Sequence, residues 1–171
     1  MKASSFAPIA RDDARILILG SMPGVESLRR QQYYAHPQNS FWKLIAEILG
    51  FEYTPDYRKR TAALIRNRVA LWDVLKFCER PGSLDSSIHV TSEVPNDFAD
   101  VFARHPAIRA VFFNGSKAAA SYRRLVLPHL KELELRYQAL PSTSPAHAAL
   151  NFAAKKRVWQ KIKTELNQVS E

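Results

Sequence analysis

Short apolar runs alternate with stretches of helical periodicity along this chain. The runs are rich in β-branched and aromatic residues, a composition that favours strands. They predict four strands, at residues 15–19, 69–73, 110–113 and 133–140. The fourth run has the weakest strand pattern of the four.

Between and after these runs, apolar residues recur at the spacing of a helix face. The clearest case covers residues 41–49, with Ser40 available as the N-cap and Gly50 placed to end the helix. Three further helices are expected to begin near Asn96, after Gly115 and near Asn151.

Strands that alternate with helices predict an α/β fold. We expect a three-layer αβα architecture with a central, mostly parallel sheet of about four strands, and a single domain over residues 1–171. Ligands of such sheets bind at the carboxyl ends of the strands. Three of the four segments that follow the predicted strands are rich in Gly, Pro or polar residues: GSMPG at 20–24, NGS at 114–116 and PSTSP at 141–145.

The composition narrows the choice of partner. Lys and Arg number 25 against 16 Asp and Glu, which gives a formal charge of +9. A basic surface gains free energy when it releases counterions from phosphate, so a nucleic acid is the favoured partner and a merely solvated basic face is the alternative. The single cysteine, Cys78, excludes an internal disulfide and the Cys-rich metal sites, and we expect no metal and no cofactor. No apolar run approaches the roughly 20 residues of a membrane-spanning helix, so we expect a cytoplasmic protein that does not bind membranes.

The most informative motif is GSMPGVESLRRQQYYAHPQNSFW at residues 20–42, with STSPA at 142–146 and Asn114 between them. In these segments the chain resembles the uracil-DNA glycosylase superfamily, most closely its hypoxanthine-DNA glycosylase branch. The resemblance implies a monofunctional enzyme of base excision repair, acting as a monomer on damaged DNA. Such an enzyme flips a deaminated base out of the helix and hydrolyses its N-glycosidic bond. Hypoxanthine is the implied base, with uracil or xanthine as secondary substrates.

The resemblance also implies roles for individual residues. Many members of the superfamily place a water-activating Asp or Asn where this chain has Met22, whose thioether cannot polarise water, and in the hypoxanthine branch catalysis passes to Asn39. Leu140 stands where a His or Asn opens the second motif of many uracil-removing members, which weakens the case for uracil. The remaining roles are contact with the base, for Gly20, Ser21, Met22, Tyr34 and Asn114, and contact with DNA, for Ser142, Thr143, Ser144 and His147.

The chemistry is compatible with an amide in place of a carboxylate. A glycosidic bond breaks through an oxocarbenium-like sugar, so the site must stabilise a cationic sugar, an anionic leaving base and a positioned water. An Asn amide is a poor base, and Asn39 would therefore act by positioning and electrostatics. The motifs contain no lysine apart from Lys117, so a Schiff-base lyase step is not expected.

Each of these residues also has a structural interpretation. Asn39 lies just before the expected helix and could be only a cap or turn former. Asn114 could close a turn, Tyr34 could be a core aromatic, and the PSTSP segment could be an ordinary surface loop. The side chain that fills the vacated base stack could be either His147 or Leu150.

Two other classes of function stay open. One is a nucleic-acid-binding module that keeps the fold without the chemistry, although the two motif asparagines argue against it. The other is a serine hydrolase built from Ser21 or Ser142 with His147 and Asp73, although the Gly-x-Ser-x-Gly elbow of such enzymes is absent.

Overall fold

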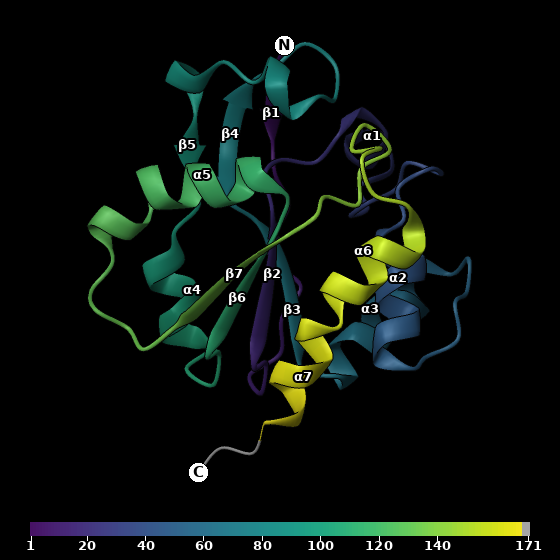
Figure 1. Cartoon of the computed structure of the whole chain (residues 1–171). Helices are drawn as coiled ribbons and strands as arrows, with labels where there is room; N and C mark the ends of the chain where they lie inside the picture. The colour runs from purple at the N-terminus through teal and green to yellow at the C-terminus, as the bar shows by residue number, and fades with distance from the viewer. Residues whose placement is uncertain (169–171) are drawn as a thin grey trace.

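The structure, a computed structural model, describes residues 1–168 and has the predicted three-layer arrangement (Figure 1). Every residue of the three strands β2, β3 and β6 is buried, which explains why their sequences are apolar without alternation. Because all neighbouring pairs are parallel, the four carboxyl ends of the main sheet meet at one edge. In spatial order the strands are β3 (Val69–Asp73), β2 (Ile16–Gly20), β6 (Ala110–Asn114) and β7 (Arg136–Leu140).

Helices cover both faces of this sheet. Figure 1 shows α4 and α5 on one face and α2, α3, α6 and α7 on the other. Within residues 1–168, none of the helices has the length and apolar character needed to cross a membrane. The helices are α1 (Val25–Arg30), α2 (Phe41–Leu49), α3 (Tyr57–Arg66), α4 (Phe98–Arg104), α5 (Ser116–Leu125), α6 (Phe152–Trp159) and α7 (Lys161–Asn167).

A second, antiparallel sheet was not predicted from the sequence. Its strands are β1 (Lys2–Ser4), β4 (Leu75–Glu79) and β5 (Val94–Pro95), in the order β1-β4-β5. The first and last are three and two residues long, too short to show a periodic pattern. The backbone N–H groups of Val74 and Leu75 donate to the carbonyls of Gly20 and Ser21, at 2.8 and 3.1 Å. These bonds hold the start of β4 against the carboxyl end of β2.

The start of α2 differs from the prediction. Ser40 precedes the helix, but its hydroxyl donates to the carbonyl of Thr143 (3.3 Å) and does not cap. The side chain of Asn39 takes that role, because its Oδ1 accepts from the N–H of Phe41 at 3.0 Å. Gly50 ends the helix as predicted, with a φ of 76° that favours a residue without a Cβ.

Two further elements differ from the prediction. The edge strand β7 begins at Arg136 instead of residue 133, because the chain still turns at Leu135, whose N–H donates to the carbonyl of Leu133. The C-terminal helix begins after Asn151 as predicted, with the Asn151 side chain as its cap, but a break at Gln160 divides it into α6 and α7.

Candidate active site

The carboxyl ends of the four parallel strands open into one cleft of about 940 Å³, a volume typical of ligand sites. Gly20, Asp73, Asn114 and Leu140 end the four strands, and all of them line it. The segment between α1 and α2 and the loop after β7 form further walls. The cleft therefore lies at the sheet edge where the sequence predicted chemistry.

All ten residues that the sequence singled out for catalysis, base contact and DNA contact line this cleft. They are Gly20, Ser21, Met22, Tyr34, Asn39, Asn114, Ser142, Thr143, Ser144 and His147. Leu150, the alternative to His147 for filling the base stack, is 37% exposed and is not among the residues that line the cleft.

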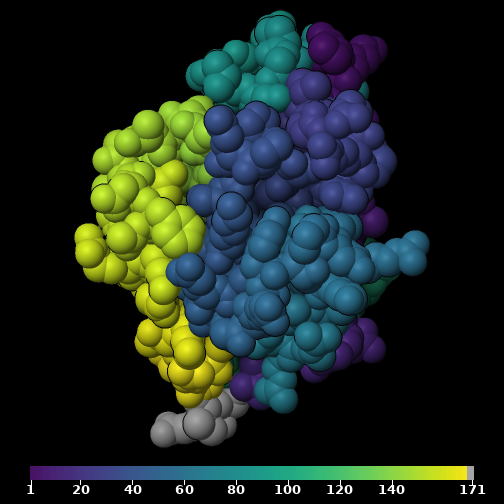
Figure 2. Space-filling view, turned by 90° about the vertical axis from the view of Figure 1, so that its right-hand side faces the viewer, coloured from purple at the N-terminus to yellow at the C-terminus, as the bar shows by residue number. Residues whose placement is uncertain are grey.

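Asn114 and Thr143 bind each other at the centre of the cleft wall. The amide Nδ2 of Asn114 donates to Thr143 Oγ1, and the backbone N–H of Thr143 donates to Asn114 Oδ1, both at 2.9 Å. Both residues are buried, Thr143 to 1% exposure. The N–H of Ser40 donates to the Thr143 carbonyl, and Figure 2 shows the yellow-green segment after β7 lying beside the blue segment before α2. Thr143 thus joins three segments that form the cleft.

Asn39 is half-buried beside this junction. Its side-chain oxygen caps α2 through the N–H of Phe41. Among the described residues its Nδ2 has no hydrogen-bond partner, so two N–H donors remain for a ligand or water. The capping interpretation and the functional interpretation of Asn39 are therefore compatible, because they use different atoms of one amide.

Gly20 makes room for two oxygens at the floor of the cleft. A Cβ at this position would lie 2.6 Å from Asp73 Oδ1 and 2.9 Å from the Tyr34 hydroxyl. The ring of Tyr34 packs on Phe41 with centroids 4.2 Å apart. The Tyr34 backbone has a φ of 53°, in the left-handed region that a bulky residue rarely adopts. Burial, followed by the negative charge of Asp73, raises the pKa of the Tyr34 hydroxyl, so it remains a neutral donor.

Asp73 also lines the cleft, and the sequence did not assign it to base contact. Its side chain is 3% exposed, and Oδ2 is buried with no hydrogen-bond partner in the described part of the chain. Burial, and then the negative charge of Asp85, raise the pKa of its carboxyl to about 8, against the opposing charge of Arg80. The available signal was a single acidic residue ending the otherwise apolar run Val-Ala-Leu-Trp-Asp.

The serine hydrolase alternative finds no support in these contacts. Ser21 Oγ donates to Asp85 Oδ1 at 2.5 Å, and Ser142 Oγ accepts from the N–H of Ser144 at 3.1 Å. Neither hydroxyl has a hydrogen bond to His147 within residues 1–168, so no nucleophile and base are paired.

Lys117, which lines the cleft, is also engaged in an ion pair. It forms an ion pair with the buried carboxylate of Glu93, which also binds Arg124. A lysine whose Nζ is engaged in an ion pair is not free to act as a Schiff-base nucleophile. The cleft also receives the start of α5 at Gly115 and Ser116, where the helix dipole favours negative charge.

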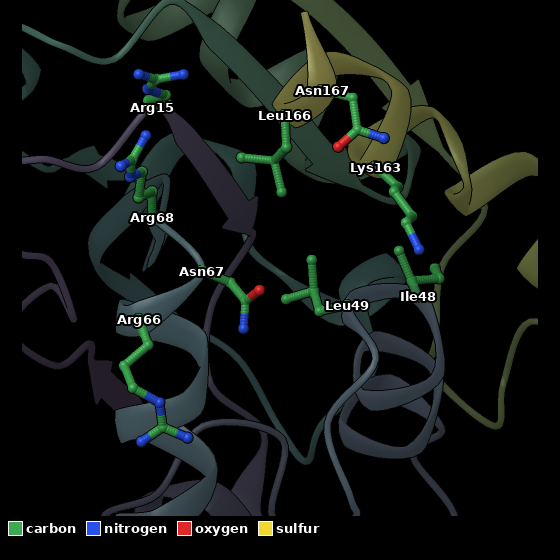
Figure 3. A pocket seen from close by; sticks show the side chains of 9 residues that line it. All are labelled: Arg15, Ile48, Leu49, Arg66, Asn67, Arg68, Lys163, Leu166 and Asn167. Atoms are coloured by element: carbon green, nitrogen blue, oxygen red, sulfur yellow. The ribbon is translucent and has the colours of Figure 1, made fainter.

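A smaller cavity of about 320 Å³ lies at the opposite edge of the sheet, where Arg15 and Arg68 precede β2 and β3 (Figure 3). Leu49 and Leu166 extend into it from two sides, whereas the guanidinium of Arg66 points away. Its basic side chains do not converge on a common point, so they are not arranged to bind one anion.

The family of the chain follows from comparison with known proteins. Residues 7–163 match the uracil DNA glycosylase superfamily, and the chain belongs to that superfamily. Within it, the chain is 41% identical over 119 residues to the hypoxanthine DNA glycosylase of Methanosarcina barkeri, covering 69% of this chain and 74% of the relative. It is 40% identical over 144 residues to the hypoxanthine DNA glycosylase of Methanosarcina acetivorans, covering 83% and 86%.

The fold agrees with this placement. A solution NMR structure from Methanosarcina acetivorans, of a protein assigned as a uracil DNA glycosylase, superposes with a TM-score of 0.75 at 34% identity. The superposition covers 95% of this chain and 99% of the other. The predicted fold class and family are confirmed.

Proposed function

We propose that this chain is a monofunctional DNA glycosylase that hydrolyses the N-glycosidic bond of hypoxanthine flipped out of DNA, with uracil or xanthine as secondary substrates. One observation carries the proposal. In a chain of this superfamily, the residues of three separated motifs converge on a single cleft at the carboxyl edge of the sheet. The names of the two relatives support the choice of hypoxanthine.

The cleft has the groups that a dissociative cleavage needs. As the bond breaks, negative charge develops on the base and positive charge on the sugar. The free Nδ2 of Asn39 can donate to the departing base or hold the attacking water, and the amino end of α5 favours the anionic base. We assign catalysis to Asn39 on these grounds. We assign base contact to five residues: Gly20, Ser21 and Met22 in the turn after β2, Tyr34, and Asn114.

We assign contact with the DNA backbone to Ser142, Ser144 and His147 at the cleft wall. The serine hydroxyls can donate to phosphate oxygens and help to hold the strand while the base is extruded. Thr143, which we expected to share this role, is buried with its hydroxyl bound to Asn114. Its contribution to DNA binding is accordingly to hold the loop in place.

The proposal is tested with duplex oligonucleotides that each carry one hypoxanthine, uracil, xanthine or mismatched thymine. With enzyme in excess, alkali cleavage of the abasic product measures excision without the effect of product release. We expect hypoxanthine to be excised fastest and no strand cleavage before alkali is added. Strand cleavage without alkali would contradict a monofunctional enzyme, and faster removal of uracil would contradict the proposed preference.

We also propose that the chain acts as a monomer. Light scattering during size-exclusion chromatography, with and without hypoxanthine-containing duplex, measures this directly. A two-to-one ratio of protein to duplex would contradict it.

A further inference from the structure

Arg80, which follows β4, is a buried cation without a counter-ion. It is 2% exposed. Its Nε donates to the carbonyl of Gly82 at 3.0 Å, and Nη2 donates to the carbonyl of Pro23 at 2.5 Å. Within residues 1–168, Nη1 is buried with no hydrogen-bond partner, and no carboxylate forms an ion pair with the guanidinium. Arginine is almost never buried unless it is paired, and burial of an unpaired charge costs stability. The placement of this charge therefore points to a role beyond packing.

The guanidinium of Arg80 lies behind the turn that follows β2. Pro23, whose carbonyl it binds, belongs to that turn and lines the cleft. The segment after Arg80 is also held against the turn, because the N–H of Val25 donates to Ser83 Oγ at 2.8 Å. At the cleft floor, burial raises the pKa of Asp73, and the positive charge of Arg80 opposes this rise. The charge of Arg80 therefore acts inside the cleft, although Arg80 is not among the residues that line it.

Arg80 has no competitor among the lysines and arginines of the cleft wall. In the described part of the chain, Lys117 is the one such residue that lines the cleft, and the buried carboxylate of Glu93 binds its ammonium group. An unpaired positive charge beside a cleft is complementary to a negative charge within it.

We infer that the buried charge of Arg80 stabilises the negative charge that develops on the departing base, acting through space and not by contact. The inference rests on the proposed glycosylase function. When the N-glycosidic bond breaks, both of its electrons go to the base. Water adds to the sugar carbon, and the proton that the water releases neutralises the base. A fixed cation in a site without bulk water stabilises such an anion strongly and needs no reorganisation during the reaction.

The test compares Arg80→Gln with Arg80→Lys. Both side chains are shorter than arginine and keep an N–H donor for the carbonyl of Pro23, but only lysine keeps a positive charge. In single-turnover excision of hypoxanthine, Arg80→Gln should be roughly tenfold to a hundredfold slower than the parental enzyme. Arg80→Lys should recover a large part of that loss.

A pair of leaving groups separates an electrostatic role from a displaced turn. 8-Azahypoxanthine has the shape of hypoxanthine, but its additional ring nitrogen stabilises the anion, so its departure depends less on a cation in the protein. The rate loss of Arg80→Gln should therefore be at least about threefold smaller on 8-azahypoxanthine than on hypoxanthine. Ser83→Ala is the neutral control, because it removes the hydrogen bond from Val25 to the same segment and leaves the charge in place. It should affect both substrates equally.

A second position keeps the inference testable if Arg80→Gln does not fold. Cys78 is buried in β4, where burial raises the pKa of its thiol and the charge of Arg80 opposes the rise. Cys78→Asp adds a counter-charge to Arg80, whereas Cys78→Asn has a similar shape without the charge. Relative to Cys78→Asn, Cys78→Asp should show the same selective loss on hypoxanthine, and circular dichroism with thermal unfolding establishes which variants are folded.

The inference is overturned if folded Arg80→Gln excises hypoxanthine at the parental rate, or if its losses on the two substrates are equal. Failure of the proposed function gives a different result. A parental enzyme that excises none of the tested bases would refute the proposed function itself. If it removes uracil instead of hypoxanthine, the proposed substrate is refuted, and uracil with 5-fluorouracil, the better leaving group, forms the pair that decides the role of Arg80.

Discussion

At the scale of single residues, the side-chain oxygen of Asn39 caps α2, and we propose that its nitrogen acts in catalysis. We predict that Asn39→Ala lowers the excision rate a hundredfold or more, about 3 kcal/mol in the chemical step. The same change should cost about 1 kcal/mol of stability, because the N–H of Phe41 loses its cap. Single-turnover excision measures the first effect, and thermal unfolding measures the second.

Asn39→Asp is the matched control for that experiment. Aspartate keeps an oxygen to cap α2 but has no N–H donors, so stability should be retained while excision stays slow. A fast Asn39→Asp enzyme would mean that the side-chain oxygen acts on the water. An Asn39→Ala enzyme that melts lower yet excises at the parental rate would show that Asn39 is structural.

Gly20 is required for its lack of a side chain. We predict that Gly20→Ala slows hypoxanthine excision by at least tenfold and destabilises the protein by about 1–3 kcal/mol. The reason is that the new Cβ would lie 2.6 Å from Asp73 Oδ1 and 2.9 Å from the Tyr34 hydroxyl. Gly50→Ala, which introduces strain but meets no atom within 4 Å, should lower stability without slowing excision by the folded enzyme. Equal excision rates for the parental and Gly20→Ala enzymes would show that a Cβ at residue 20 does not disturb the positions of Asp73 and Tyr34.

At the scale of elements, the loop after β7 is held by the pair of hydrogen bonds between Asn114 and Thr143. We predict that Thr143→Val destabilises the protein by about 1–3 kcal/mol, because a buried amide donor of Asn114 is left without a partner. Thr143→Ser keeps the hydroxyl and should lose less. Denaturant unfolding measures both variants, and a Thr143→Val protein as stable as the parental one would show that this hydrogen bond is not what holds the loop.

At the scale of the whole molecule, the charge of +9 should govern binding to undamaged DNA. We predict that the logarithm of the affinity for duplex falls linearly with the logarithm of the salt concentration, with a slope of about −0.9 for each phosphate neutralised. Fluorescence anisotropy over a range of salt concentrations measures this slope. Arg66 lies at the edge opposite the cleft, so the control variant Arg66→Gln should leave the slope unchanged. A flat response of the parental protein would mean that the excess charge serves another purpose.

The sequence by itself determined the layers of the fold and ten of the residues that line the cleft. Apolar periodicity is a local property, and it located the main-sheet strands and α2 because each must bury its own apolar face. The strand ends then had to share one edge, since the carboxyl ends of parallel strands meet there, and this brought Gly20, Asn114 and the 141–145 loop together. The sequence did not predict the second sheet, because strands of two and three residues are too short to show an alternation of apolar and polar residues.

Only the tertiary structure decided what the polar atoms in the cleft do. The oxygen of Asn39 caps α2 while its nitrogen has no hydrogen-bond partner among the described residues, and the Thr143 hydroxyl accepts from Asn114 across 29 positions of the sequence. Burial, and then the negative charge of Asp85, raise the pKa of the Asp73 carboxyl to about 8. Hydrogen-bond partners and protonation depend on distances between segments that are remote in the chain and on the exclusion of water, and neither is encoded in a local pattern of residues.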